Sequence, residues 1–214
     1  VEETGHRRGR RLDAGRVRRL AVANQPDVLI GREQHPAPDL FLGVCIDCSG
    51  SMMFEDRMDK ALSFGALLME AARGLPGVDG YAVGFTDHCI YDVGPPGSTR
   101  LPSLEPEGGN NDAAGLLALA RHALRSKKRR RLLVMISDGF PTECSLASLQ
   151  GLVTALQRDY DLVSLQVAVA EMESARVAFP RFTDLTEHDL TSATRAFGRL
   201  IQRTLQREFG LGGS

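Results

Sequence analysis

The apolar run from Leu40 to Ile46 ends abruptly at an aspartate, Asp47. A second apolar run, residues 132–136, ends in the same way at Ser137-Asp138-Gly139. Strands that are apolar on both faces are typical of a parallel sheet whose two faces are covered by helices. The two runs therefore predict central strands of an α/β domain, each followed by a polar loop.

Helical and strand-like segments alternate through most of the remaining chain. Apolar residues recur at every third or fourth position in the helical segments, whereas the strand-like segments are short and continuously apolar. We expect helices over about 58–73, 113–124, 146–156 and 190–205, and strands over about 81–85, 89–93, 162–170 and 181–185. Residues 94–109 and 171–180 are expected to be loops, and Ser145 to cap the third helix. The pattern predicts a three-layer, doubly wound, Rossmann-like α/β fold with a mostly parallel central sheet.

The domain organisation is predicted from composition. We expect a basic lead-in over residues 1–38, one α/β domain over 39–210 and a short tail over 211–214. The lead-in is rich in arginine, which indicates a solvated segment, with a polyanion-binding arm as the alternative. A short helix from Asp13 and an edge strand at Val28-Leu29-Ile30 are expected within it.

The first candidate site follows the first apolar run. Asp47, Ser49 and Ser51 present one carboxylate and two hydroxyls at alternate positions. Oxygen ligands of this kind suit a small hard cation such as Mg²⁺, although the same residue types also cap helices. In doubly wound sheets ligands bind beyond the carboxyl ends of the strands, where Asp138 and Thr86-Asp87 are also expected.

Three short motifs together resemble those of von Willebrand factor A (VWA) domains. They are Asp47-x-Ser49-x-Ser51, Gly109-Asn110-Asn111-Asp112 and Ser137-Asp138-Gly139, in that order along the chain. The resemblance covers about Leu40 to Phe209 and implies a VWA fold. In that family the three loops form a metal-ion-dependent adhesion site.

The resemblance also implies roles for individual residues. Ser49 and Ser51 would bind Mg²⁺, or else Mn²⁺ or Ca²⁺, through their hydroxyls, while Asp47 and Asp138 would act through ordered water or as second-shell acceptors. Asn110 stands where the family usually has threonine, and its amide oxygen is a competent hard ligand.

Other residues near the three motifs have two interpretations each. Asp112 is either an alternative metal contact or the N-cap of the following helix. Asp87 and His88 follow a strand end, so they are candidates for an additional metal or rim contact, while a solvated loop position is the alternative for His88.

The predicted function is binding without catalysis. A first shell with little negative charge leaves an open position that favours a carboxylate from a partner protein. The lead-in 9–16 and the Asn-x-Asp form of residues 110–112 resemble the cobaltochelatase T subunit. This resemblance implies an AAA+ ATPase partner of the MoxR or chelatase type, with a free-standing VWA module for an acidic partner as the alternative.

Composition and the motifs present argue against nucleic-acid binding, membrane insertion and the common hydrolase activities. The net charge of −1 produces no overall positive potential that would attract nucleic acid or an anionic membrane surface. No apolar run reaches the roughly 18 residues of a membrane span. The chain has no GxxxxGK[ST] loop for ATP hydrolysis and no GxSxG motif for a serine nucleophile. A phosphatase with Asp47 as its nucleophile is the enzymatic alternative, but that chemistry would need a second carboxylate where Ser49 stands.

Cys45 and Cys48 have CxxC spacing, but no second CxxC accompanies them, so a zinc or redox role is only the minor alternative. The four cysteines are consistent with a reducing, cytoplasmic location.

Overall fold

The computed structural model of the 214-residue chain describes residues 2–6, 11–12, 29–32, 39–139, 141–170 and 175–184. The chain divides into two units, residues 1–37 and 38–214. The candidate site lies in the second unit.

The first unit contains a three-stranded antiparallel sheet. Its strands are β1 (Glu2–His6), β2 (Arg11–Leu12) and β3 (Leu29–Arg32), and β3 lies between the other two. The edge strand predicted at Val28-Leu29-Ile30 is therefore the middle strand of a separate small sheet. The short helix predicted from Asp13 lies outside the described residues.

The second unit is built on a six-stranded sheet with the order β6-β5-β4-β7-β8-β9. All neighbouring strands are parallel except β6, which forms an antiparallel pair with β5 as the predicted hairpin. The strands are β4 (Leu40–Asp47), β5 (Val78–Phe85), β6 (Ile90–Gly94), β7 (Arg130–Ser137), β8 (Leu162–Ala168) and β9 (Phe182–Asp184).

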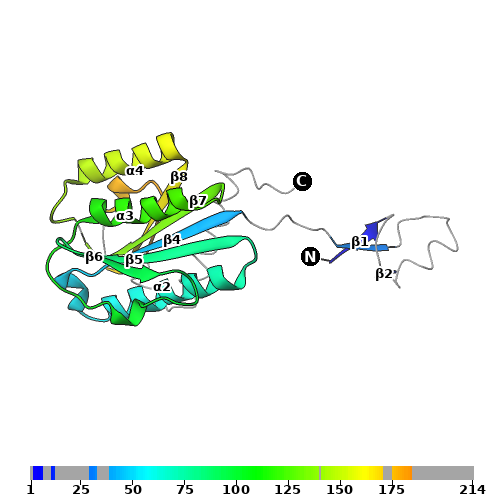
Figure 1. The fold of residues 1–214 in the computed structure, drawn as a ribbon, viewed down its shortest axis with the longest axis horizontal. Coiled ribbons are helices and arrows are strands. Elements are labelled where there is room, and N and C mark those ends of the chain that lie inside the picture. The colour runs from blue at the N-terminus through cyan, green and yellow to red at the C-terminus, as the bar shows by residue number, and fades with distance from the viewer. Residues whose placement is uncertain are drawn as a thin grey trace. The chain divides into compact units, whose positions relative to one another are not determined.

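Helices cover both faces of this sheet, with α2 on one side and α3 and α4 on the other (Figure 1). Alternate residues of β4 explain the two layers, because successive side chains of a strand point to opposite faces. Leu42 and Val44 pack in the core beneath α2, whereas Phe41 and Cys45 pack in the core beneath α3 and α4. The predicted three-layer, doubly wound α/β fold is confirmed.

The helices begin close to the predicted positions. They are α2 (Arg57–Gly74), α3 (Asp112–Arg125) and α4 (Leu146–Tyr160), and Ser145 caps α4 by accepting from the Ser148 N–H. The side chain of Asn111 caps α3, so the interpretation of Asp112 as the N-cap is wrong. None of the described helices is both long and apolar enough to cross a membrane.

Two predicted loops contain short helical turns. Residues 94–109 include the 3₁₀ turn η2 (Leu101–Ser103), and residues 171–180 include α5 (Ala175–Ala178). A further 3₁₀ turn, η1 (Gly50–Met53), follows β4 directly. The C-terminal helix predicted over 190–205 lies outside the described residues.

Candidate functional site

Parallel pairing brings the polar strand ends to one edge of the sheet. Ile46 of β4 pairs with Ile136 of β7, so Asp47 and Ser137 end neighbouring strands at the same level. On its other side Asp47 pairs with Phe85, the last residue of β5. The candidate site therefore lies at the carboxyl ends of the central strands, as predicted.

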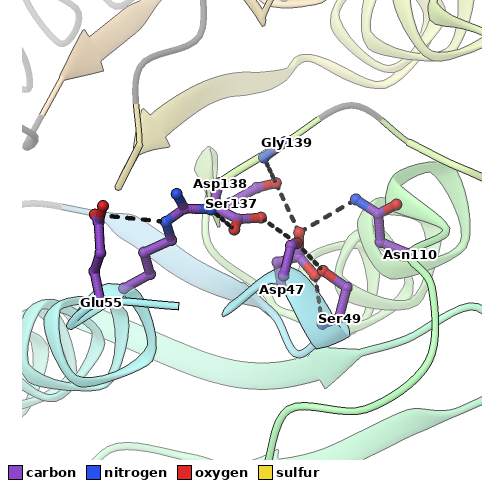
Figure 2. A network of polar contacts seen from close by, with 9 residues as sticks. Asp47, Ser49, Glu55, Asn110, Ser137, Asp138 and Gly139 are labelled. Carbon is purple, nitrogen blue, oxygen red and sulfur yellow. Dashed lines mark hydrogen bonds and ion pairs between the residues drawn. The ribbon is translucent and has the colours of Figure 1, made fainter. Parts of the chain in front are cut away.

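Asp47 is fully buried and accepts hydrogen bonds from three loops (Figure 2). Its Oδ1 accepts from the backbone N–H of Ser49 at 2.8 Å. Its Oδ2 accepts from Ser137 Oγ at 2.8 Å and from Asn110 Nδ2 at 3.2 Å. Burial raises the pKa of the Asp47 carboxyl, and the hydrogen bonds from Ser49 and Ser137 act against that rise.

Three oxygen atoms form a continuous row beside Asp47. Ser49 Oγ and Ser51 Oγ lie 3.1 Å apart, and Ser51 Oγ donates to Asp138 Oδ1 at 2.8 Å. Adjacent ligands of an octahedral Mg²⁺, each about 2.1 Å from the metal, lie about 3 Å from one another. The same separations are those of ordinary hydrogen bonds between the three groups, so the fit to a small hard cation rests on the gathering of hydroxyl and carboxylate oxygens at one point.

The row depends on serine hydroxyls. Among the described residues, no three histidine, cysteine, aspartate or glutamate side chains gather closely enough to hold a metal ion. Ser49 and Asp138 are buried and Ser51 between them is exposed, so the middle of the row reaches the surface. A cation held here would keep part of its coordination sphere open to the outside.

The side chain of Asn110 is oriented away from the predicted ligand geometry. Its nitrogen points to Asp47, and its oxygen Oδ1 accepts from the backbone N–H of Thr142 at 2.8 Å. Thr142 Oγ1 in turn contacts both the N–H and the carbonyl oxygen of Asn110. In this arrangement both amide atoms of Asn110 are engaged with protein groups.

Asp112 is a buried carboxylate without a hydrogen-bond partner for either oxygen among the described residues. Burial raises its pKa to about 8, and the negative charge of Asp47 contributes to the rise. Asp112 is the first residue of α3, where the helix dipole favours a negative charge, but the effect of burial outweighs that of the dipole. The site thus contains one carboxyl group that is readily held in the neutral form.

Asp87 and His88 lie on the loop after β5. Asp87 is mostly buried beneath Gly108 and Gly109, and its backbone N–H donates to the Gly109 carbonyl at 2.9 Å. His88 is 84% exposed, with Nε2 at 3.2 Å from Asp87 Oδ2. Within the described part of the chain, no hydrogen bond or ion pair joins either side chain to Asp47 or to the oxygen row.

Sequence reasoning missed three residues that shape the site. Ser137 was recognised as part of the third motif but was given no role, although its hydroxyl donates to Asp47. Thr142 orients Asn110 from 32 positions further along the chain, and no local pattern marks it. Arg57 Nη1 lies 2.9 Å from Asp138 Oδ2, and its position at the start of a helix gave no indication of this contact.

The cysteines show no pairing. All four are free, and Cys45 and Cys48 are buried in the two cores that flank β4. Burial raises the pKa of the Cys48 thiol to about 12, which keeps the sulfur protonated.

Comparison with known proteins defines the class of fold. No protein-family model and no curated protein matches the sequence. The structure is similar to the PilB minor pilin from Streptococcus sanguinis, with a TM-score of 0.62 at 11% identity over 87% of this chain. This chain spans 66% of the pilin's length.

Two further solved structures carry VWA domains by description. The SpRpn10 VWA domain matches with a TM-score of 0.57 at 12% identity, covering 75% of this chain and 95% of that domain. A von Willebrand factor type A protein from Catenulispora acidiphila matches with a TM-score of 0.56 at 18% identity, covering 76% of this chain and 42% of that one. The chain therefore has the fold of a VWA domain, and at these identities the likeness is one of fold alone.

Proposed function

We propose that this chain is a non-enzymatic protein-interaction domain that docks a carboxylate of a partner protein through a divalent cation, Mg²⁺ in the first place. The observation that carries the proposal is the row of oxygens Ser49 Oγ, Ser51 Oγ and Asp138 Oδ1, spaced at 3.1 and 2.8 Å at the sheet edge. The support lies in the type of these oxygens, two hydroxyls and a carboxylate within hydrogen-bond distance of one another, which are ligands that Mg²⁺ accepts.

The residues of the site have different proposed roles in holding the cation. Ser49 and Ser51 would hold the cation through their hydroxyl oxygens, and Asp47 and Asp138 would supply the negative charge behind them. Asn110 remains a predicted ligand, although its amide oxygen would first have to leave the Thr142 N–H. When bound, the cation supplies an electrophilic open position that favours an anionic oxygen from outside.

Apolar surface beside the site supports a protein as the partner. Met53 and Phe54 follow Ser51 after one buried residue, Met52, and are 69% and 64% exposed. Large apolar side chains next to a polar anchor are typical of protein interfaces, where they exclude water from the central contact. A partner that offers an aspartate or glutamate next to an apolar residue would satisfy both features.

We further propose an AAA+ ATPase of the MoxR or cobaltochelatase type as the partner. This part rests on the resemblance of residues 9–16 and 110–112 to the cobaltochelatase T subunit. The chain lacks a GxxxxGK[ST] loop, so ATP hydrolysis in such an assembly would belong to the partner.

The test combines thermal unfolding with capture of a MoxR-type ATPase. Wild type is expected to melt higher in MgCl₂ than in EDTA and to retain the ATPase, whereas Ser49→Ala/Ser51→Ala loses both effects. Because EDTA also removes Mg²⁺ from the ATPase nucleotide, the double variant in MgCl₂ isolates the cation of this domain. Ser63→Ala, an exposed serine on α2, is the matched control.

The outcomes separate the parts of the proposal. If neither the melting temperature nor ATPase capture responds to the double substitution, cation-dependent docking is wrong. A Mg²⁺-dependent melting shift without ATPase capture would leave the cation site standing and overturn the choice of partner. In that case an acidic partner of another class would have to be sought.

A further inference from the structure

Arg57 places a positive charge inside the candidate cation site. Its guanidinium Nη1 lies 2.9 Å from Asp138 Oδ2, and the two side chains are 81 positions apart in sequence. The Asp138 side chain is fully buried, and that of Arg57 is only 23% exposed. The pair is thus largely shielded from water, where charge–charge interactions are stronger than at the surface.

The same carboxylate belongs to the oxygen row. Asp138 Oδ1 accepts from Ser51 Oγ while Oδ2 faces Arg57, so one carboxylate joins the arginine to the proposed cation ligands. A divalent cation held by the row would therefore lie one carboxylate away from a guanidinium. Two positive charges at such a separation repel, and they also compete for the negative charge of Asp138.

Arg57 has a second acidic partner outside the site. Glu55 Oε2 lies 3.9 Å from Arg57 Nε, and the Glu55 side chain is 75% exposed. Arg57 Nε itself has no hydrogen-bond partner among the described residues, so the guanidinium is incompletely satisfied in its present position. The backbone of Glu55 has a positive φ of 56°, a conformation that non-glycine residues rarely adopt and that holds Glu55 beside the start of α2.

We propose that Arg57 is an internal counter-ion that competes with the divalent cation for Asp138, and that cation loading moves the guanidinium from Asp138 toward Glu55. This inference rests on the proposed cation site. The competition would raise the cation concentration needed to fill the site, because binding must outweigh the Arg57–Asp138 interaction. A partner carboxylate that stabilises the bound cation would then also favour release of Arg57.

A positioning role for Arg57 makes the opposite prediction. If the guanidinium served to orient Asp138 toward Ser51, its removal would loosen the oxygen row and weaken cation binding. If it competes with the cation, its removal strengthens binding. The sign of the change in cation affinity therefore decides between the two roles.

The experiment measures binding of Mg²⁺ and Mn²⁺ alone to the full chain by isothermal titration calorimetry. Arg57→Gln is expected to bind both cations about tenfold more tightly than wild type or better, since a unit positive charge has been removed from the site. Arg57→Lys keeps the charge and should remain near wild type. Arg73→Gln is the matched control, because Arg73 pairs with exposed Glu70 on the same helix, about 24 Å further along.

A second variant tests the proposed release position without touching the buried pair. Glu55→Gln removes the exposed partner of Arg57 and is expected to weaken cation binding about threefold, with Glu70→Gln as its control. Equal or weaker cation affinity in Arg57→Gln overturns the inference while leaving the cation site intact. Binding by Arg57→Gln but not by wild type supports the inference, and absence of binding in every variant overturns both proposals.

Discussion

Ser51 Oγ donates a hydrogen bond to Asp138 Oδ1 over 2.8 Å, although 87 positions separate the two residues in sequence. The contact joins the loop after β4 to the loop after β7, which are neighbouring strands of the sheet. The second carboxylate oxygen of Asp138, Oδ2, contacts Arg57, so Asp138 connects three segments of the chain at one point. Both the stability and the cation affinity of the site should therefore depend on this carboxylate.

Asp138→Asn should destabilise the fold in the absence of any cation. The substitution leaves the partly buried guanidinium of Arg57 with only the exposed Glu55, 3.9 Å away, as a charged partner, for which we expect a loss of about 2 kcal/mol. Urea unfolding in EDTA measures the change. Asp56→Asn removes the exposed ion pair with Lys60 and should change the stability far less, because water screens that pair. Similar losses in the two variants would mean that the Arg57–Asp138 pair is no more than a surface contact.

Asn110→Thr should exchange stability for cation affinity. The Asn110 amide now bridges Asp47 and the backbone N–H of Thr142. Threonine would replace this amide with a shorter hydroxyl and leave the Thr142 N–H without its acceptor. We expect a loss of about 1 kcal/mol in EDTA and a several-fold gain in Mg²⁺ affinity. Calorimetry with MgCl₂ measures the second effect.

The control for this exchange is the next residue. Asn111→Thr keeps a side-chain oxygen at the N-cap of α3, so cation affinity should not change. If Asn110→Thr weakens Mg²⁺ binding while Asn111→Thr does not, the amide of Asn110 is itself a ligand, as the sequence predicted. The pair of variants thus distinguishes a ligand from a residue that orients Asp47.

The central sheet could be predicted because its pattern is local. Leu40–Ile46 is apolar at every position except Gly43, and that composition suffices to indicate a strand buried on both faces. Once parallel strands are expected, their carboxyl ends must share an edge, and this brings Asp47 and Asp138 to the same site. The N-terminal strand β1 was missed because its residues, Glu2–His6, are polar and show no alternation.

The details of the site depended on contacts that sequence spacing does not carry. Asn110 lies beside Asp47 in the loop before α3, but its orientation is determined by Thr142, 32 positions later. Arg57 lies among the helical residues after η1, where an arginine is ordinarily solvated, and only the folded chain places it against Asp138. Long-range pairs of this kind follow from the tertiary arrangement of loops and not from local propensity.

Stability should fall as the pH rises, because of Asp112. Its pKa is about 8 in the fold against an ordinary 3.8, so between these values the folded chain holds a proton that the unfolded chain releases. The free energy of unfolding should therefore decrease by up to about 1.4 kcal/mol per pH unit within this window and level off above it. Urea unfolding in EDTA at about pH 5 and about pH 8 measures the slope.

Asp112→Asn isolates this contribution, since asparagine is similar in shape and does not titrate. The variant should be more stable than wild type near the upper end of the window, and its stability should depend less on pH. A shallower slope should remain because burial also raises the pKa of Asp47. Parallel curves for the two proteins would show that Asp112 is ionised in the fold.

Gly115→Ala should destabilise the domain by driving α3 away from the sheet. A Cβ at Gly115 would lie 2.7 Å from the ring of Phe85 and 3.0 Å from Cys45 Sγ, and both side chains are fully buried. Overpacking of this kind costs about 1–3 kcal/mol.

Gly151→Ala in α4 is the matched control for that substitution. A Cβ at Gly151 would have no atom within 4 Å, so the gain in helix propensity should stabilise the domain by about 1 kcal/mol. Because α3 begins just after Asn110, displacement of its first turn should also reduce the melting shift produced by MgCl₂ in Gly115→Ala but not in Gly151→Ala. Thermal unfolding with and without MgCl₂ measures both effects, and two variants that change stability in the same direction would contradict the close approach of α3 to β4 and β5.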